Sequence, residues 1–214
     1  MFTGIVREVG KILQKQLSDE GAVFRLGCSP ELYGELEVGH SVSIDGVCLT
    51  VSHKSCGAFE VEATPETLRL TNLGGRESGD QSNLEPAAKW SDFIGGHLVQ
   101  GHADGTGKVA FRNPEGNSWI FEIEAPQNIL EHCVLKGSVA VNGVSLTLSG
   151  LNSNSFEVTI IPHTFQVTNF RLLEVGGLVN LEADLISKYV EQHVDRLTRN
   201  SAQRDPIGEH SPGK

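Results

Sequence analysis

The sequence predicts an all-β chain of two similar barrels in tandem, followed by one helix. The first observation is an internal repeat, because a shift of 97 residues aligns 41–85 on 138–182 without a gap. Of the 45 aligned positions 19 are identical, where average composition gives roughly three by chance. The second observation is that each copy consists of short alternating or β-branched runs, broken by glycine and by Asp-Gly or Asn-Gly pairs. Such runs are typical of antiparallel hairpins.

The expected strands of the first copy are short, and each has an equivalent one repeat later. They are Gly4–Leu13, Val23–Gly27, Ser41–Ile44, Cys48–Ser52, Phe59–Ala63 and Gln81–Leu84. About six strands in under roughly 100 residues favour a small closed barrel, because closure leaves no exposed sheet edge.

Two stretches of each copy depart from the strand pattern and predict short helices that begin after a proline. They are Pro30–Leu36 and Glu66–Asn72, with the counterparts Pro126–Val134 and His163–Asn169. The join between the copies falls near Glu85–Gly95, and a second opening strand is expected to begin at Leu98–Gly101.

The chain after the second copy has a helical period. Within Leu185–Thr198 the apolar residues fall on one stripe, which consists of Ile186, Tyr189, Val190, Val194 and Leu197. Such a stripe can pack back on a barrel or assemble with copies of itself. The expected domains are barrels over 1–94 and 95–184, a helix over 185–199 and a disordered polar tail over 200–214.

Charge and cysteine content narrow the classes of function. The 17 basic and 27 acidic residues give a net charge of −10, which argues against nucleic acid and membrane surfaces as partners. The four cysteines, Cys28, Cys48, Cys56 and Cys133, form no CxxC pair, so neither a disulfide framework nor a zinc site is predicted. The sequence has no leader-like or membrane-spanning segment, and we expect a cytoplasmic protein.

The best guide to chemistry is the set of positions at which the two copies differ. The unequal pairs are Cys48 with Ser145, Ile5 with His102, Glu66 with His163, and Ala87 with Asp184. Because the scaffold residues agree while these residues do not, the sequence predicts two similar pockets that do unequal jobs.

Each of these residues has a structural interpretation beside the functional one. Cys48 is either a small buried apolar residue or a thiolate nucleophile. His102 is either bonded to backbone at a strand end or a proton-transfer group, and Ser145 is either a strand serine or a ligand contact. Asp184 suits a helix N-cap. His97 and His102 form an HxxxxH pattern, but this spacing without a third ligand is weak evidence, and no metal is predicted.

Seven motifs in order are specific enough to name a family. They are MFTGIV, VSIDGVCLTV, ATPETLRLTNLG, IGGHLVQGHADGTG, SVAVNGVSLTL, IIPHT and VNLEADLISKYV. Together they resemble riboflavin synthases over roughly residues 1–195.

The resemblance implies two tandem six-stranded antiparallel Greek-key barrels with a C-terminal α-helix that forms a homotrimer. It implies an enzyme that converts two molecules of 6,7-dimethyl-8-ribityllumazine into riboflavin and 5-amino-6-ribitylaminouracil by moving a four-carbon unit, without a cofactor. Two like ligands, one donor and one acceptor, explain a duplicated pocket. The site is expected between the first barrel of one subunit and the second barrel of its neighbour. A lumazine synthase shell as a partner stays open.

The resemblance also assigns site residues. The expected catalytic residues are Cys48, His102, Ser145 and Asp184. The expected substrate shell in the first copy is Gly4, Ile5, Val6, Ser41, Cys48, Leu49, Thr50, Glu62, Ala63, Thr64, Pro65, Glu66 and Thr67. In the second copy it is Gly101, His102, Ala103, Lys136, Ser145, Leu146, Thr147, Ile160, Ile161, Pro162, His163, Thr164 and Phe165.

Two other functions stay open beside the enzyme. An antenna protein of the same superfamily would bind a lumazine or a flavin without converting it. A structural trimer built on the final helix and the acidic surface would bind no lumazine, but it does not account for the many polar residues in the strands.

Overall fold

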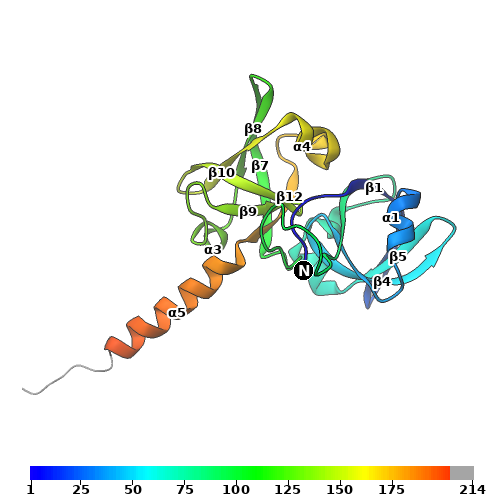
Figure 1. Cartoon of the computed structure of the whole chain (residues 1–214), viewed down its shortest axis with the longest axis horizontal. Helices are drawn as coiled ribbons and strands as arrows, with labels where there is room; N and C mark the ends of the chain where they lie inside the picture. Colours follow the sequence, from blue (N-terminus) through cyan, green and yellow to red (C-terminus); the bar gives the residue numbers. More distant parts are fainter. Residues whose placement is uncertain (203–214) are drawn as a thin grey trace, which may run out of the picture.

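The computed structural model describes residues 1–202, which form two closed antiparallel barrels and a long C-terminal helix (Figure 1). Each barrel has six strands, so the predicted architecture is confirmed. The first contains β1 (Glu8–Ser18), β2 (Gly21–Gly27), β3 (Ser41–Ile44), β4 (Val47–Ser55), β5 (Ala58–Ala63) and β6 (Gln81–Pro86), in the order β1-β2-β5-β4-β3-β6.

The second barrel repeats the same cyclic order one copy later, β10-β11-β8-β7-β12-β9. Its strands are β7 (Gly105–Glu115), β8 (Ser118–Glu124), β9 (Ser138–Val141), β10 (Val144–Leu151), β11 (Ser155–Ile160) and β12 (Leu178–Ala183).

Short helices connect strands at matching places in the two copies. They are α1 (Pro30–Glu35), α2 (Pro65–Leu70) and η1 (Asn72–Gly75), then α3 (Gln127–Leu130), α4 (Pro162–Val167) and η2 (Asn169–Leu172). Thr64 caps α2, since its hydroxyl accepts a hydrogen bond from the Thr67 backbone nitrogen. The helix predicted over Pro126–Val134 is shorter than expected. The helices predicted over Glu66–Asn72 and His163–Asn169 each divide into an α-helix and a 3-10 turn.

The opening strand of each copy begins later than predicted. β1 starts at Glu8 rather than at Gly4, and β7 starts at Gly105 rather than at Leu98–Gly101. The residues in between stay outside the barrels because they pair with each other and contact the opposite barrel.

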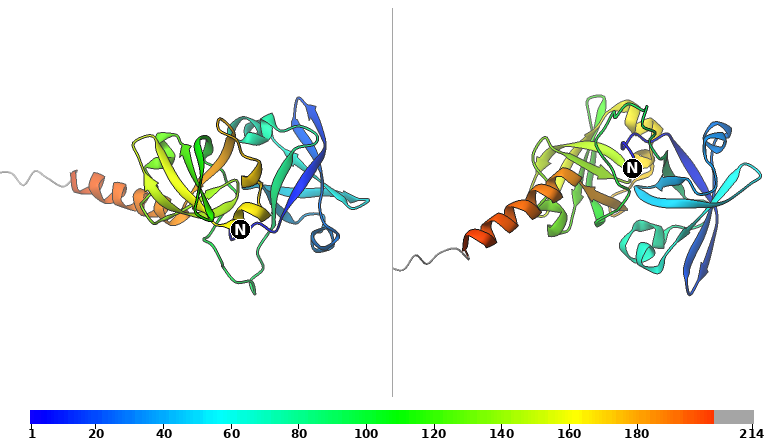
Figure 2. Two further views of the ribbon diagram at one scale, coloured as in Figure 1. Left: turned by 90° about the horizontal axis from the view of Figure 1, so that it is seen from above. Right: turned by 60° about the horizontal axis from the view of Figure 1, so that its bottom comes forward.

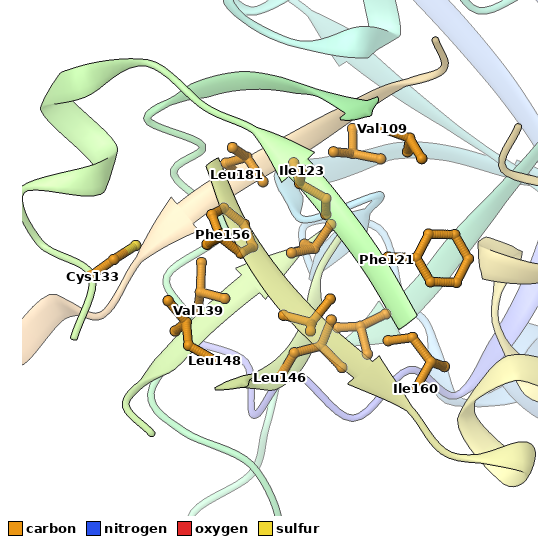
Figure 3. Packing of buried hydrophobic residues seen from close by; sticks show 14 of the residues in the cluster. Val109, Phe121, Ile123, Cys133, Val139, Leu146, Leu148, Phe156, Ile160 and Leu181 are labelled. Atoms are coloured by element: carbon orange, nitrogen blue, oxygen red, sulfur yellow. The ribbon is translucent and has the colours of Figure 1, made fainter. Parts of the chain in front are cut away.

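Apolar side chains fill the barrel interiors. Figure 3 shows Phe156 near Val139 and Leu148 in the core of the second barrel, with Phe121 farther along it. In β4 of the first barrel the side chains alternate, so Val47, Leu49 and Val51 are buried while Cys48 and Thr50 are not. The polar candidates therefore lie on the outer wall of a barrel, and a ligand would bind there rather than inside.

Two hairpin turns meet back to back where the barrels touch. Asp45-Gly46 and Asn142-Gly143 are equivalent in the repeat, and their four φ angles are 48°, 80°, 46° and 74°. This left-handed backbone is the one that two-residue hairpin turns require. A Cβ on Gly46 would lie 2.6 Å from the Gly143 backbone nitrogen, so this contact needs glycine.

Buried amides surround these turns and bond across the barrel interface. The Asn72 backbone nitrogen donates to Asn180 Oδ1 at 2.6 Å, and the equivalent Asn169 nitrogen donates to Asn83 Oδ1 at 2.7 Å. Asn169 Nδ2 also donates to Asp45 Oδ1 at 2.8 Å. All five side chains are buried, and a buried polar group without a partner is costly. This amide cluster therefore fixes how the barrels sit on each other.

A single charge pair makes the amide cluster unequal between the copies. Arg76 Nη2 lies 2.8 Å from Oδ2 of the fully buried Asp45. Burial raises the pKa of Asp45, and the guanidinium opposes that shift. One repeat later the two positions hold Asn142 and Leu173, so the second copy lacks both the acid and its cation.

Helix α5 (Leu185–Ala202) starts on the second barrel and then leaves it, as both further views show (Figure 2). Lys188 Nζ lies 2.6 Å from Asp104 Oδ1 and anchors its first turns. The apolar residues of the predicted stripe are exposed, from 51% for Val194 to 61% for Ile186 among its first four members. The helix runs past its predicted end at residue 199, and 203–214 of the predicted tail lie outside the described residues. Within residues 1–202 no helix is both long and apolar enough to cross a membrane.

Replacing Gly46 by alanine is expected to lower the free energy of unfolding by about 3 kcal/mol or more, because backbone strain adds to a clash with the opposite barrel. Gly57→Ala is the matched control, since Gly57 has φ +75° and nothing within 4 Å of an added Cβ. It should cost only the strain of about 1–2 kcal/mol. Urea unfolding measures both variants, and equal losses would contradict the close contact between the turns.

Candidate functional site

Two extended segments, 1–6 and 97–103, run between the barrels, and Figure 1 shows the N-terminus at this junction. Phe2 and Val99 pair there, with nitrogen-to-oxygen distances of 2.7 and 3.1 Å. These two residues are equivalent in the repeat, so their pairing marks the approximate twofold axis. We call the two stretches the crossing segments.

Two buried glutamates hold the crossing segments in place. Glu85 accepts hydrogen bonds from the backbone nitrogens of Thr3 at 2.7 Å and Gly4 at 3.1 Å. Glu182, its equivalent, accepts from Gln100, Gly101 and His102 at 2.7, 2.9 and 3.1 Å. Burial raises the pKa of both carboxyls, and these backbone hydrogen bonds oppose that shift. The repeated NLE motif therefore has a role that the sequence did not reveal.

Each crossing segment lies against the barrel of the other copy. The Ser145 nitrogen donates to the Gly4 carbonyl at 2.8 Å, and the Cys48 nitrogen donates to the Gly101 carbonyl at 2.8 Å. Both glycines have positive φ, and an added Cβ would lie 2.5 Å from Ser145 Cβ or 2.6 Å from Cys48 Cβ. Only glycine permits this approach.

The predicted shells are therefore exchanged between the copies. The sequence grouped Gly4–Val6 with Cys48–Thr50, and Gly101–Ala103 with Ser145–Thr147. In the structure Gly4 contacts Ser145, and Val6 packs on the core of the second barrel. Sequence position assigns a segment to its own repeat, but the backbone hydrogen bonds carry it across the interface.

The first pocket brings together Cys48 and His102. It is a cavity of about 230 Å³ whose wall combines the outer face of β4, helix α2 and the second crossing segment. Its lining residues are Val47, Cys48, Thr64, Glu66, Thr67, Leu70, Thr71, Gly101, His102 and Ala103. A thiol, an imidazole and hydroxyls thus line one cavity, as a site for proton transfer and adduct chemistry needs.

The equivalent surface of the second barrel carries different side chains at the same repeat positions. Ser145 replaces Cys48, and Ile5, 52% exposed, replaces His102. Ser145 Oγ is 2.7 Å from Nδ1 of His97, a contact that the sequence did not predict. Burial lowers the pKa of His97, and the charge of Asp184 opposes this. Asp184, one of the expected catalytic residues, thus lies where its charge acts on His97.

Asp184 also has the structural role that the sequence predicts. Its Oδ1 accepts a hydrogen bond from the Ile186 nitrogen at 2.9 Å and caps the start of α5. His97 and His102 lie against Ser145 and Cys48 respectively, so the HxxxxH pattern serves two pockets. No group of three metal-ligating side chains occurs within residues 1–202.

The remaining predicted shell residues fall into three environments. Four are buried in the barrel cores, namely Leu49, Ala63, Leu146 and Ile160. Ser41 lies opposite Thr50 on the outer face of the sheet and lines a larger cavity of about 810 Å³. Around α2 and α4 the exposed members are Glu62, Pro65, Thr147, Ile161, Pro162 and His163.

Three expected substrate-shell residues of the second copy have distinct local structures. Lys136 has φ 68°, the left-handed conformation that Gly39 adopts in the first copy, and strain of this kind gathers at functional sites. Thr164 lies in the first turn of α4 and accepts from the Thr168 nitrogen through its carbonyl at 3.2 Å. Phe165 stacks on Trp119 with ring centroids 4.7 Å apart.

The other cysteines are unsuited to nucleophilic chemistry. Burial raises the pKa of Cys28 and of Cys133 to about 11, so both stay protonated thiols at neutral pH. Cys56 is exposed on a hairpin turn of the first barrel.

Two closed barrels that place their opening segments on each other, with unlike side chains at equivalent positions beside those segments, define a tandem-barrel protein. The family model described as the lumazine binding domain matches residues 3–87 and again 100–184. The riboflavin synthase of Actinobacillus pleuropneumoniae is 40% identical over 192 residues, which are 90% of this chain and 89% of that protein. That of Schizosaccharomyces pombe is 35% identical over 198 residues, 91% and 94% of the two chains. The chain belongs to the riboflavin synthase family.

Solved structures support the same fold. The crystal structure of LumP complexed with riboflavin has a TM-score of 0.81 and 22% identity, and covers 86% of this chain and 99% of its own. LumP complexed with 6,7-dimethyl-8-(1'-D-ribityl) lumazine has a TM-score of 0.79 and the same identity and coverage. At this identity the likeness concerns the fold alone.

Replacing Glu182 by glutamine is expected to loosen the second crossing segment, because an amide offers one acceptor oxygen where three backbone N–H groups need a carboxylate. Amide hydrogen exchange of residues 100–102 should accelerate about tenfold or more, while residues 3 and 4 stay protected. In Glu85→Gln the amides of residues 3 and 4 should exchange faster, while those of residues 100–102 stay protected. Equal protection of both segments in either variant would contradict the proposed roles of the two carboxylates.

Proposed function

We propose that this chain is an active riboflavin synthase that uses its two unequal pockets for donor and acceptor. The observation that carries the proposal is the pairing of Cys48 with His102 in one pocket, while Ser145 and Ile5 occupy the equivalent places in the other. A protein that only binds its ligand needs no such difference. The curated relatives, 40% identical over most of the chain, support the same activity.

The reaction needs two molecules of 6,7-dimethyl-8-ribityllumazine and balances between them. A proton leaves the C7 methyl group of the donor, and the resulting carbanion attacks the acceptor. Four carbons then move to the acceptor, which becomes riboflavin, and the donor departs as 5-amino-6-ribitylaminouracil. Because the four carbons and the electrons that one molecule loses are gained by the other, no external oxidant or reductant takes part.

The residues of the first pocket suit the proton and adduct steps. A neutral His102 imidazole has a ring nitrogen that can take the methyl proton. Cys48 can add reversibly to the electrophilic C7 of a bound lumazine. Thr64 and Thr67 supply hydroxyls for the ribityl chain and the pyrimidinedione edge.

We further propose that the active unit is a homotrimer assembled through α5. Ile186, Tyr189, Val190 and Val194 form an exposed stripe on a helix that leaves its own barrel. An apolar stripe of this kind is stable when copies of the helix pack on it. Pairing the first barrel of one subunit with the second barrel of its neighbour would then bring donor and acceptor together. We expect the cytoplasm as the compartment, since the four cysteines are free thiols.

The test is incubation of the pure protein with 6,7-dimethyl-8-ribityllumazine alone, followed by absorbance and product analysis. One riboflavin formed for every two substrates consumed, without any additive, is the expected result. Tight binding without riboflavin would contradict the proposal and favour an antenna or storage protein.

Replacing Cys48 by alanine should lower kcat about tenfold or more, with a change in substrate affinity below about threefold, because the thiol acts on the reaction more than on binding. Cys56→Ala, at an exposed turn, is the matched control and should leave turnover unchanged. Steady-state kinetics measures both variants. Full turnover in Cys48→Ala would exclude adduct chemistry at this sulfur.

The double variant Val190→Asp, Val194→Asp should give monomers of low activity, because two charges enter the stripe while the Lys188 anchor is kept. The control Gln192→Asp adds a charge at an exposed position off the stripe and should stay trimeric. Light scattering gives the mass, and the lumazine assay gives the rate. A fully active monomer would refute a site shared between subunits.

A further inference from the structure

The second crossing segment brings one histidine to each barrel, and the reaction as described uses only His102. His102 lines the first pocket beside Cys48. His97 lies instead against Ser145 of the second barrel, with 2.7 Å between Nδ1 and Oγ. His97 precedes the second matched domain, which begins at residue 100, so comparing the two copies does not show that His97 has a role.

The backbone holds His97 in place through a close approach. Its nitrogen donates to the Thr3 carbonyl at 3.1 Å. A Cβ on the preceding Gly96 would lie 2.2 Å from the Thr3 oxygen and 2.6 Å from Ser145 Cβ, so a glycine is needed there. The imidazole is therefore seated on Ser145 by the same packing that builds the pocket.

The geometry indicates which group donates. A distance of 2.7 Å is typical of a hydroxyl donor and shorter than the roughly 2.9–3.0 Å of most N–H···O bonds. Burial keeps the imidazole neutral by lowering the pKa of His97, against the opposing charge of Asp184. This distance suits a Ser145 hydroxyl that donates to a bare Nδ1, with the ring hydrogen on Nε2.

Nε2 of His97 is buried and has no hydrogen-bond partner within residues 1–202. A buried polar atom of this kind usually finds its partner in a ligand or an ordered water. Within residues 1–202 the hydrogen bond of the imidazole therefore goes to Ser145 Oγ.

We propose that His97 is a positioning residue for Ser145: by accepting the hydroxyl hydrogen it fixes the serine rotamer and leaves the Oγ lone pairs facing the lumazine bound in the second pocket. This inference rests on the proposed function. It adds His97 to the site. His97 would act through the Ser145 hydroxyl, whereas His102 would act on the substrate itself.

The test is a double-mutant cycle in the full-length protein, with 6,7-dimethyl-8-ribityllumazine as the probe. Ser145→Ala and His97→Ala should each lower kcat about tenfold, with KM changed less than about threefold. The double variant should be no slower than Ser145→Ala, because His97 acts only through that hydroxyl. Independent, multiplying losses would overturn the inference.

A substitution that keeps a hydrogen-bond acceptor near the position of Nδ1 distinguishes a positioning role of His97 from a packing role. His97→Asn places an amide oxygen near the position of Nδ1 and should recover turnover to within about threefold of wild type, whereas His97→Gln reaches the position of Nε2 and should not. His53→Asn, at an exposed position on β4, is the control and should leave the rate unchanged. Equal rates for His97→Asn, His97→Gln and His97→Ala would contradict the role.

Failure of the inference about His97 can be told apart from failure of the proposed function. If the wild-type chain binds lumazine but makes no riboflavin, the proposed function is wrong. The same cycle is then measured on lumazine affinity by fluorescence titration, where coupling between His97 and Ser145 supports the contact and additive losses contradict it.

Discussion

The buried amide cluster between the two hairpin turns is the contact on which the rest of the molecule depends. Asp45-Gly46 and Asn142-Gly143 can touch because neither turn carries a side chain at the point of contact. The surrounding asparagines have partners across the interface, so a rotated arrangement would leave several buried amides unpaired. Polar pairing therefore sets one relative placement of two barrels that hydrophobic packing alone would specify loosely.

That placement brings the crossing segments to the opposite barrels and sets unlike side chains beside them in the two copies. The backbone framework is nearly the same in both copies, with Glu85 and Glu182 holding equivalent segments. The differences are confined to side chains, such as Cys48 and Ser145, that stand on equivalent frames. Duplication thus supplied two matched binding geometries, and substitution of a few residues made them unequal.

Much of this could be predicted from the sequence, because a repeat with 19 identities in 45 positions carries strand pattern, turn chemistry and boundaries together. The six-stranded barrels and α5 follow from local periodicity. The exchange of segments does not, since Gly4 and Gly101 bond to the opposite copy through their backbone carbonyls, and a glycine in a sequence does not say which surface it approaches. His97 was missed as a partner of Ser145 for a related reason. Its HxxxxH pattern was weighed only as a metal motif and set aside, and 48 residues separate His97 from Ser145.

The most direct test of this account is the free energy of unfolding for Arg76→Leu, alone and combined with Asp45→Asn. The second copy holds Asn142 and Leu173 at these positions, so the double variant copies a combination that the chain already uses. Arg76→Leu alone should cost about 3–5 kcal/mol, because it leaves the buried Asp45 carboxylate unpaired. Adding Asp45→Asn should recover most of that loss. A double variant no more stable than Arg76→Leu would contradict the view that the amide cluster fixes the arrangement of the barrels.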